Sequence, residues 1–558
     1  MMFNTLISIG AASRRVRNRL KDRANAFARE EDGLMTVMAL FLFLALVGAA
    51  GIGVDLMRYE QKRAALQYTM DRAVLAAADL DQQVSPETVV RSYLEKAGLL
   101  EYLSSVTVQE GLGYRKVSAT ATAELPTHFM KLSGYDSLTI PAASTAEESI
   151  GNVEISLVLD VSGSMNSNSR LYNLKNAAKE FVDHMLSATE PGTVSISIVP
   201  YATQVNAGAD ILSYYNVSTE HNYSHCVNFI DDEFSQPGLS RVTPLERTMH
   251  FDPFSYTKDP ISTPVCPVRA STEILPFSND QTVLNNYIDG LTGRGNTSID
   301  IGTKWGVVML DPGTQSVISG LISDNKVPAS FQGRPSAYDS GDVLKVLIVM
   351  SDGENTNQYM LNPSLRDGDS PVWYNAAEDV ISGSPDNNTT NAFSIYHDNG
   401  NNSYYWPDQN RWADHPYGNG QSEACGYNSS GYYSCAMRDE PGEAVRLTYA
   451  ELFAKVSLAY NAYYNFEFNS NAWAEWYTAA MTHKEASAKD QRTDHVCDAA
   501  KDEGIIVYTV GFEAPYSGRR VLKRCASSDS HYYDADGLEI SDAFTSIASS
   551  IRKLRLTQ

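Results

Sequence analysis

The sequence predicts an α/β fold: a doubly wound parallel sheet with large loop insertions, preceded by a transmembrane helix and a small α+β segment. Three observations predict it. The first is an uncharged apolar run, and the second is a set of segments after it in which apolar and polar side chains alternate. The third is a series of apolar strands separated by amphipathic helices beyond residue 151. The predicted regions are a basic leader, a membrane helix, a helix with a small sheet, and the α/β domain, at residues 1–33, 34–54, 55–150 and 151–558.

The composition is that of a folded, acidic protein. Of the 558 residues, 43% are hydrophobic and 20% charged, and the formal net charge is −23. Nucleic-acid binding depends on clustered Lys and Arg that contact phosphates. The acidic balance therefore argues against a general nucleic-acid binder.

The apolar run at residues 34–54 is long enough to cross the hydrocarbon core of a bilayer as a helix. The residues before it contain seven Arg or Lys and four Asp or Glu, so the positive-inside rule keeps that end cytoplasmic and exports the rest. A cleaved signal peptide is one alternative, although its apolar stretch is usually shorter. Cleavage after Gly33, as in prepilins, is another, but Met38 stands where such sites usually have Glu.

Residues 55–80 contain no Gly or Pro and have apolar side chains at helical spacing, so we expect the membrane helix to continue through them. A second helix is expected at 86–98. Alternating side chains then predict strands at 106–109, 114–125 and 138–146. A long helix against a small antiparallel sheet is a pilin-like arrangement, and a structural stalk is the simplest interpretation of it.

From residue 152 the pattern changes to apolar strands and helices. Strands are expected at 153–159, 194–199, 343–350 and 505–511, and helices at 170–186 and 540–554. Two insertions, at about 207–276 and 355–440, lack periodicity but are rich in aromatic residues. Disordered segments are usually poor in aromatic residues, so we expect both insertions to pack on themselves.

All six cysteines follow the apolar run, as expected of an exported chain in an oxidising compartment. Six cysteines allow 15 pairings, and the pairing of sequence neighbours is our expectation, with free buried thiols as the alternative. The disulfide candidates are Cys226, Cys266, Cys425, Cys435, Cys497 and Cys525.

The strongest chemical signal is the Asp-Val-Ser-Gly-Ser loop at the end of the 153–159 strand. Asp160, Ser162 and Ser164 offer a carboxylate and two hydroxyls at alternate positions. Thr297, in a glycine-rich loop, and Asp352, at the end of the 343–350 strand, can reach the same edge of the sheet, where open α/β folds bind ligands. Such oxygen ligands suit Mg²⁺, with Mn²⁺ or Ca²⁺ as alternatives. Capping roles for these residues are the competing interpretation.

This constellation resembles the metal-ion-dependent adhesion site of von Willebrand factor type A domains. The resemblance covers Asp160, Ser162 and Ser164 in the first loop, Thr297 in the second and Asp352 in the third. It implies an ion held by hydroxyls and two acids, with an open position for a partner's acidic residue. We further expect the second insertion, which follows Asp352 directly, to control what reaches the ion.

The order of segments along the whole chain points to a more specific family than the metal site alone. The basic leader, an apolar run ending in Gly-Ile-Gly-Val-Asp, the Arg-Ala-Ala-Leu-Gln helix after it and the exported domain together resemble the TadG-like proteins of the tight-adherence (Flp) pilus system. The resemblance implies a single-pass protein of the bacterial inner membrane with a cytoplasmic N-terminus and a periplasmic C-terminal domain. It implies partners among pilus assembly proteins or pilin subunits, and no enzymatic reaction.

Two other function classes remain open. A stand-alone surface adhesin or glycan-binding protein could stack sugars on the aromatic residues Tyr404, Tyr405, Trp406 and Trp412. A metal-dependent hydrolase is a weaker alternative, because the chain has no GxSxG, HExxH or Walker-type loop. His221, His225 and Cys226 could form a metal-binding helix face, but their Asn- and Tyr-rich surroundings favour loop residues.

Overall fold

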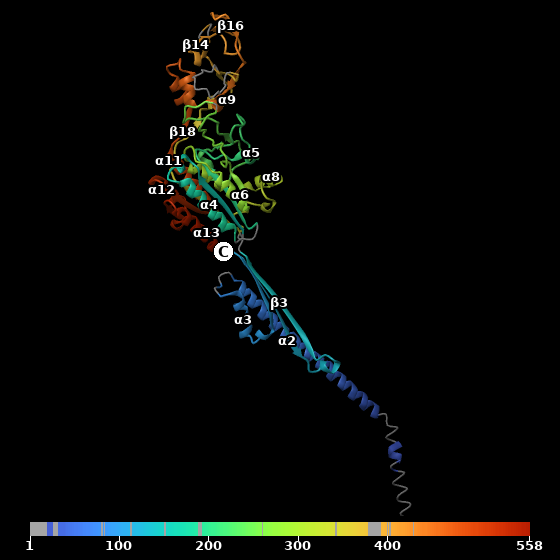
Figure 1. Ribbon diagram of the computed structural model, residues 1–558. Coiled ribbons are helices and arrows are strands. Elements are labelled where there is room, and N and C mark those ends of the chain that lie inside the picture. Colours follow the sequence, from blue (N-terminus) through green and yellow to red (C-terminus); the bar gives the residue numbers. More distant parts are fainter. Residues whose placement is uncertain are drawn as a thin grey trace, which may run out of the picture. The chain divides into compact units, whose positions relative to one another are not determined.

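The protein forms two compact units, one ending at Ser149 and one beginning near residue 150 (Figure 1). Most of the basic leader lies outside the residues that the computed structural model describes. Those residues are 19, 21–25, 32–79, 82, 84–111, 114–149, 152–187, 192–258, 260–340, 343–377, 392–398, 400, 403–427 and 429–557.

The first unit is built on one continuous helix, α2 (Asp32–Ala78). Its apolar N-terminal part has exposed side chains, and the helix from Met35 to Ala78 is apolar and long enough to cross a membrane, with a mean hydropathy of 2.5 in its most apolar window. A surface of this kind is consistent with a single-pass anchor or a signal segment.

The C-terminal half of α2 packs against α3 (Pro86–Lys96) and a three-stranded antiparallel sheet, as the sequence pattern predicts. Alternate residues of the central strand, from Val117 to Ala123, are buried in the same cluster as Leu66 and Met70 of α2. The opposite face of the sheet carries Ser, Thr and charged side chains. The strands, in sheet order, are β1 (Leu103–Gly111), β2 (Tyr114–Pro126) and β3 (Ser137–Ser149).

A six-stranded sheet with helices on both faces organises the second unit, which confirms the predicted fold class. Five strands are parallel, and the edge strand β8 is antiparallel to β5, a departure from the all-parallel expectation. In sheet order the strands are β20 (Tyr532–Ala535), β19 (Ile506–Phe512), β9 (Val343–Ser351), β4 (Asn152–Asp160), β5 (Val194–Tyr201) and β8 (Leu275–Ser278).

Alternate residues of the central strands face two separate apolar clusters. Ile155 and Leu157 belong to one cluster and Val158 to the other, because neighbouring side chains of a strand point to opposite faces. The helices of the first face are α4 (Arg170–Leu186), α6 (Gln281–Asp289) and α13 (Glu539–Thr557). Those of the second are α7 (Ile299–Val308), α8 (Gln315–Ser323), α11 (Ala486–Asp502) and α12 (Tyr516–Cys525).

The first insertion packs on the second face of the sheet and is closed by the Cys226–Cys266 disulfide. The structure also pairs Cys497 with Cys525 and Cys425 with Cys435, so all three pairs are the sequence neighbours we expected. The regular elements of this insertion are α5 (Gly208–Leu212), β6 (Val227–Asn228) and β7 (Glu246–Arg247).

The second insertion extends beyond its expected end near residue 440 and forms a module that is closed at its root by an antiparallel ribbon of β10 and β18. The apolar core of this module also includes Met249, Phe251 and Val265 of the first insertion. Within it a five-stranded sheet has the order β14-β13-β12-β11-β17. The module elements are β10 (Gln358–Leu361), β11 (Asp369–Asn375), β12 (Phe393–Tyr396), β13 (Tyr404–Trp406), β14 (Arg411–Ala413), β15 (Gln421–Tyr427), β16 (Tyr433–Asp439), β17 (Ala444–Thr448), α9 (Tyr449–Lys455), α10 (Leu458–Tyr460) and β18 (Met481–Lys484).

Candidate metal centre

Asp160 ends β4 at the carboxyl edge of the sheet, where the sequence placed it, and its side chain is fully buried. One carboxylate oxygen accepts the backbone N–H of Ser162 at 2.8 Å, and the other accepts the hydroxyl of Ser351, in β9, at 2.7 Å. These two bonds fix the carboxylate between neighbouring strands. No sequence motif singles out Ser351.

A chain of oxygen atoms connects the first loop to the third. The hydroxyls of Ser162 and Ser164 lie 3.0 Å apart, and Ser164 Oγ donates to Oδ1 of Asp352 at 2.8 Å. In an octahedral Mg²⁺ site with bonds of ~2.1 Å, neighbouring ligand atoms lie ~3 Å apart. The spacing and the hard-oxygen chemistry of this set therefore fit a small divalent cation.

Thr297 is buried directly before α7, next to the loop that carries Asp352. A Cβ on Gly353 would lie 3.3 Å from Thr297 Oγ1, which shows how closely the hydroxyl approaches that loop. The first and second loops are joined by two backbone hydrogen bonds, Gly163 N to Gly295 O at 2.8 Å and Arg294 N to Val161 O at 2.9 Å. The structure thus brings all three predicted loops to one edge of the sheet.

Burial and mutual repulsion disfavour the charged forms of the two carboxylates. Burial, together with the charge of Asp352, raises the pKa of Asp160, and burial raises the pKa of Asp352. A divalent cation would favour the ionised form of both groups. The raised pKa values of these carboxylates and the spacing of the oxygen atoms therefore both fit a divalent cation at this site.

Arg170, the first residue of α4, supplies the positive charge that the structure does contain. Its guanidinium donates to Oδ2 of Asp352 at 2.9 Å and to Glu513 at 2.8 Å. This contact holds the pKa of Glu513 below its usual value. Glu513 has a left-handed backbone, φ 52°, an unusual conformation for this residue type. Sequence reasoning missed both residues.

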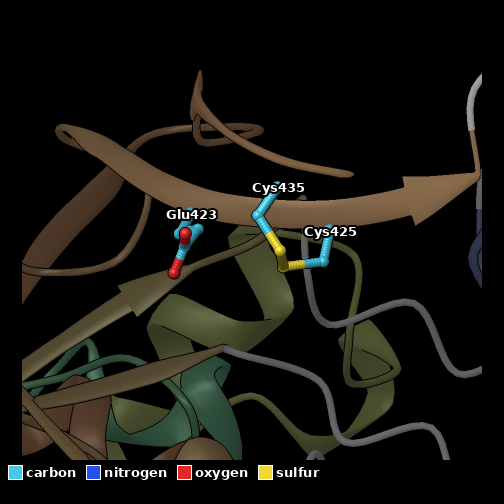
Figure 2. Close-up of side chains that lie close together, drawn as sticks. All are labelled: Glu423, Cys425 and Cys435. Carbon is cyan, nitrogen blue, oxygen red and sulfur yellow. A yellow bond between two sulfur atoms is a disulfide. The ribbon is translucent and has the colours of Figure 1, made fainter. Parts of the chain in front are cut away.

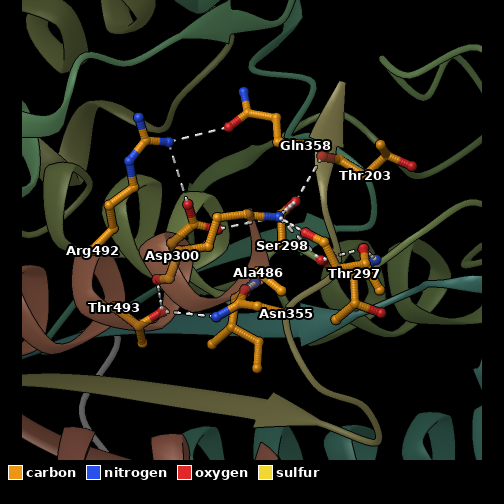
Figure 3. A network of polar contacts seen from close by, with 12 residues as sticks. Thr203, Thr297, Ser298, Asp300, Asn355, Gln358, Ala486, Arg492 and Thr493 are labelled. Atoms are coloured by element: carbon orange, nitrogen blue, oxygen red, sulfur yellow. Dashed lines mark hydrogen bonds and ion pairs between the residues drawn. The ribbon is translucent and has the colours of Figure 1, made fainter. Parts of the chain in front are cut away.

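A buried polar network connects the second loop at Thr297 with α11 and with the segment that follows Asp352 (Figure 3). Lys489 of α11 donates to Ser298 Oγ at 2.5 Å, and to the carbonyl oxygens of Thr356 at 2.8 Å and Thr297 at 3.3 Å. Its ammonium group also lies 3.6 Å from Asp300, which is fully buried. Lys489 therefore holds the backbone of the second loop against the segment that follows Asp352.

Asn355 and Arg492 extend this network (Figure 3). Asn355 accepts the backbone N–H of Ile299, at the start of α7, and donates to Thr493 of α11. Arg492 lies 3.7 Å from Asp300 and donates to Gln358, the first residue of β10. The network thus ties the root of the second insertion to the metal-centre loops.

Two other groups of cysteine, histidine and acidic residues in the described part of the chain have their ligand atoms in other bonds. Glu423, Cys425 and Cys435 lie close together, but both sulfur atoms are used in a disulfide (Figure 2). Cys226 is likewise bonded to Cys266, and His221 is bonded to the carbonyl oxygen of Thr248.

The aromatic residues considered for sugar stacking belong largely to the core of the second insertion. Tyr405 and Trp406 are 1% exposed, and Tyr404 and Trp412 are half-buried. Tyr405, Trp412 and Phe468 pack with ring centroids 4.8–5.3 Å apart. Their packing supports the expectation of a self-packed insertion and leaves little surface of Tyr405 and Trp406 for a ligand.

Residues 33–80 match a family model named Tad and described as "Putative Flp pilus-assembly TadE/G-like". The matched segment contains the apolar part of α2 and the half that packs on the small sheet. No curated protein matches the chain.

Several solved structures are similar to this chain. The vWF domain of the type V pili tip protein Mfa5 from Porphyromonas gingivalis is 16% identical, with a TM-score of 0.31, over 73% of this chain and 97% of that one. The pilus adhesin SpaC from Lactobacillus rhamnosus GG is 13% identical, with a TM-score of 0.26, over 81% of this chain and 34% of that one. Mussel proximal thread matrix protein 1, with a zinc-occupied MIDAS motif, is 12% identical, with a TM-score of 0.25. The match covers 73% of this chain and 46% of the mussel protein.

These TM-scores are too low to establish a common overall fold, and the match spans only about a third of SpaC and about half of the mussel protein. The fold class of the second unit rests instead on its strand order and its two helical layers.

Proposed function

We propose that this chain is a membrane-anchored, periplasm-facing protein of the tight-adherence (Flp) pilus system, which assembles or anchors the pilus. It binds its partners through a divalent ion held by Asp160, Ser162, Ser164, Thr297 and Asp352, here called the metal-centre residues. The observation that carries the proposal is the chain of oxygen atoms from Ser162 through Ser164 to Asp352. The family match at residues 33–80 supports the pilus context.

The single-pass topology is part of the proposal. The apolar part of α2 would span the inner membrane, with the basic leader in the cytoplasm and the chain from residue 55 onward outside. Three disulfides in the second unit support an oxidising compartment for it.

In this mechanism the protein positions the oxygen atoms that would hold the ion. Asp160 is oriented by the Ser162 amide and the Ser351 hydroxyl, and Thr297 by the network of Lys489. When bound, Mg²⁺, or Mn²⁺ or Ca²⁺ in its place, supplies an electrophilic position for an acidic side chain of the partner. With only two carboxylates among its ligands, the site leaves part of the ion's charge for that partner. We propose recognition rather than catalysis.

A stand-alone adhesin that binds glycans is the second candidate. Tyr256, Tyr463 and Trp473 form an exposed aromatic group, in which the rings of Tyr256 and Trp473 are stacked with centroids 6.2 Å apart. Exposed stacked rings are common in binding surfaces. Glycan binding that survives substitution of Asp160 but is lost in Trp473→Ala would favour this candidate.

The proposal is tested by cross-linking in cells that assemble Flp pili. We expect the full-length protein to cross-link to a pilin subunit or a pilus assembly protein. The cross-link should be lost in Asp160→Asn and kept in Asp289→Asn, which changes an exposed carboxylate on the same unit. Equal cross-linking by Asp160→Asn would refute the metal-dependent mechanism, and partners outside the pilus system would refute the pilus assignment.

A further inference from the structure

The loop between β2 and β3, residues 127–136 and here called the hairpin loop, is attached to α2 where the apolar run ends. A Cβ on Gly51 would overlap the ring of Phe129, so the loop packs directly on the helix at this level. Four residues later, the buried carboxylate of Asp55 accepts the backbone N–H groups of Phe129 and Met130 at 2.7 and 2.9 Å. It also accepts that of His128 at 3.1 Å.

The hairpin loop has a defined shape. Thr127 N donates to Asp136 O at 3.1 Å, which closes the base of the loop, and Tyr135 N donates to Met130 O at 3.2 Å. Gly134 adopts a left-handed backbone, φ 90°, and ends the short helical turn Met130–Ser133. The side chains on the outer surface of the loop are therefore held at a fixed height relative to α2.

That outer surface carries exposed apolar side chains and one ion pair. Leu132 is 86% exposed, the highest value of any large apolar side chain in the described part of the chain, and Tyr135 is 59% exposed. Lys131, directly before Leu132, has a side chain that is 67% exposed, and its ammonium group lies 3.6 Å from the exposed carboxylate of Asp136. A Tyr, an aliphatic residue and a Lys at the end of an apolar helix are the residue types that occupy membrane–water interfaces.

We propose that the hairpin loop is a membrane-interface anchor, in which Leu132 and Tyr135 enter the outer headgroup region of the same bilayer that α2 spans. Lys131 then lies near the lipid phosphates. The inference rests on the proposed function in one respect, which is that α2 spans a bilayer. Its consequence is that the small sheet is held at the membrane surface by two contacts, the helix and the loop, which limits the tilt of the unit.

The test places an environment-sensitive fluorophore on single introduced cysteines of the full-length protein in phosphatidylethanolamine–phosphatidylglycerol vesicles. All six native cysteines are in disulfides, so the label reacts at the introduced thiol. The positions are Leu132→Cys in the loop, Leu44→Cys in the apolar run and Thr145→Cys as an exposed control. Thr145 follows Ser144, which bonds Asp71, about 24 Å along α2 from Asp55 at 1.5 Å per residue.

Quenching by brominated lipids measures contact with the bilayer. We expect the label at 132 to be quenched at least about twofold more strongly than the label at 145, with blue-shifted emission. Equal quenching at 132 and 145, with strong quenching at 44, overturns the interface anchor and leaves the membrane span standing. A blue shift at 132 without lipid quenching also overturns it, because a protein surface then covers the loop. No quenching at 44 overturns the span and, with it, the anchor.

Discussion

The guanidinium of Arg170 donates to Oδ2 of Asp352 at 2.9 Å, so a cation of the protein already contacts a metal-centre carboxylate. Arg170 also bonds Glu513 and thereby links α4 to the end of β19. This contact compensates the buried carboxylates in the metal-free protein and opposes a divalent ion beside them.

We predict that Arg170→Gln tightens Mg²⁺ binding about tenfold, or ~1.4 kcal/mol, because a positive charge next to the ion is removed. The same substitution should lower the melting temperature of the metal-free protein, and added Mg²⁺ should restore it. Isothermal titration calorimetry and thermal unfolding measure the two effects. Lys179→Gln, which removes a half-buried cation of the same helix that pairs with Asp289 on the surface, serves as the control and should leave Mg²⁺ binding unchanged. Weaker Mg²⁺ binding by Arg170→Gln would show that the guanidinium supports the ion.

Lys489 is predicted to be essential for the second loop. Replacing it with Met leaves Asp300 with one fewer buried countercharge and removes the donor to Ser298, so we expect a loss of about 3–5 kcal/mol in the free energy of unfolding. The double variant Lys489→Met/Asp300→Asn should recover part of that loss, because the buried charge is then gone. Denaturant titration measures both variants, and strictly additive losses would contradict the coupling.

Two glycines of α2 provide a matched pair for the helix–loop contact. A Cβ on Gly51 overlaps Phe129, whereas a Cβ on Gly53 meets nothing within 4 Å. We therefore predict that Gly51→Ala displaces the hairpin loop and increases its cleavage by proteases in detergent. Gly53→Ala should leave cleavage unchanged, because its Cβ meets no atom of the loop and Ala is well tolerated in a helix. Equal cleavage of both variants would place the loop away from the helix.

Stability should depend on pH through His221. Tyr223 N donates to its Nδ1, so the proton lies on Nε2, which donates to Thr248 O, and burial lowers its pKa to about 4. The unfolded chain, with a pKa near 6.5, binds the proton more readily. The free energy of unfolding should therefore fall as the pH drops from about 6.5 to about 4, by at most roughly 3 kcal/mol.

Chemical denaturation at pH 7 and pH 4.5 checks this dependence. His221→Gln should reduce the loss between the two pH values, and His483→Gln, at an exposed histidine, should not. An unchanged loss in His221→Gln would assign the acid sensitivity to other groups.

The second insertion can be removed at its root. Gln358 pairs with Lys484 and Leu361 with Met481, so an Asn-Gly turn can replace residues 362–480. Phe251 and Val265, which pack on the removed module, would be changed to Ser and Thr in the same variant. We expect Mg²⁺ affinity within about twofold of the full chain but altered cross-linking to partners. Loss of Mg²⁺ binding by a folded variant would contradict the view that the second insertion selects partners without holding the ion.

Much of the fold could be predicted from the sequence because its elements carry clear periodic patterns. The apolar patterns of β4 and β9 predicted two neighbouring strands. Because an Asp follows the apolar part of each, the pattern also predicted that Asp160 and Asp352 meet at the carboxyl edge of the sheet. The antiparallel edge strand β8 could not be predicted, because four residues are too short for a periodic signal. The module root at β18 was missed because this strand, too, has only four residues.

The residues that surround the metal centre could not be found in the same way. Arg170 and Glu513 are 343 positions apart, and only the packing of α4 beside the end of β19 brings them together. Lys489 lies on a polar helix and would be taken for a solvated residue, yet it is fully buried. Buried charges of this kind depend on tertiary partners that have no local sequence pattern.

The most direct test of the central claim is calorimetric titration of the full-length protein with Mg²⁺ and Mn²⁺, beside Asp160→Asn and the control Asp289→Asn. We expect one ion per chain for the wild type and the control. For Asp160→Asn, which keeps the shape of the side chain but loses its charge, we expect an affinity at least about tenfold lower. Undiminished ion binding by Asp160→Asn, or none by the wild type, would contradict it.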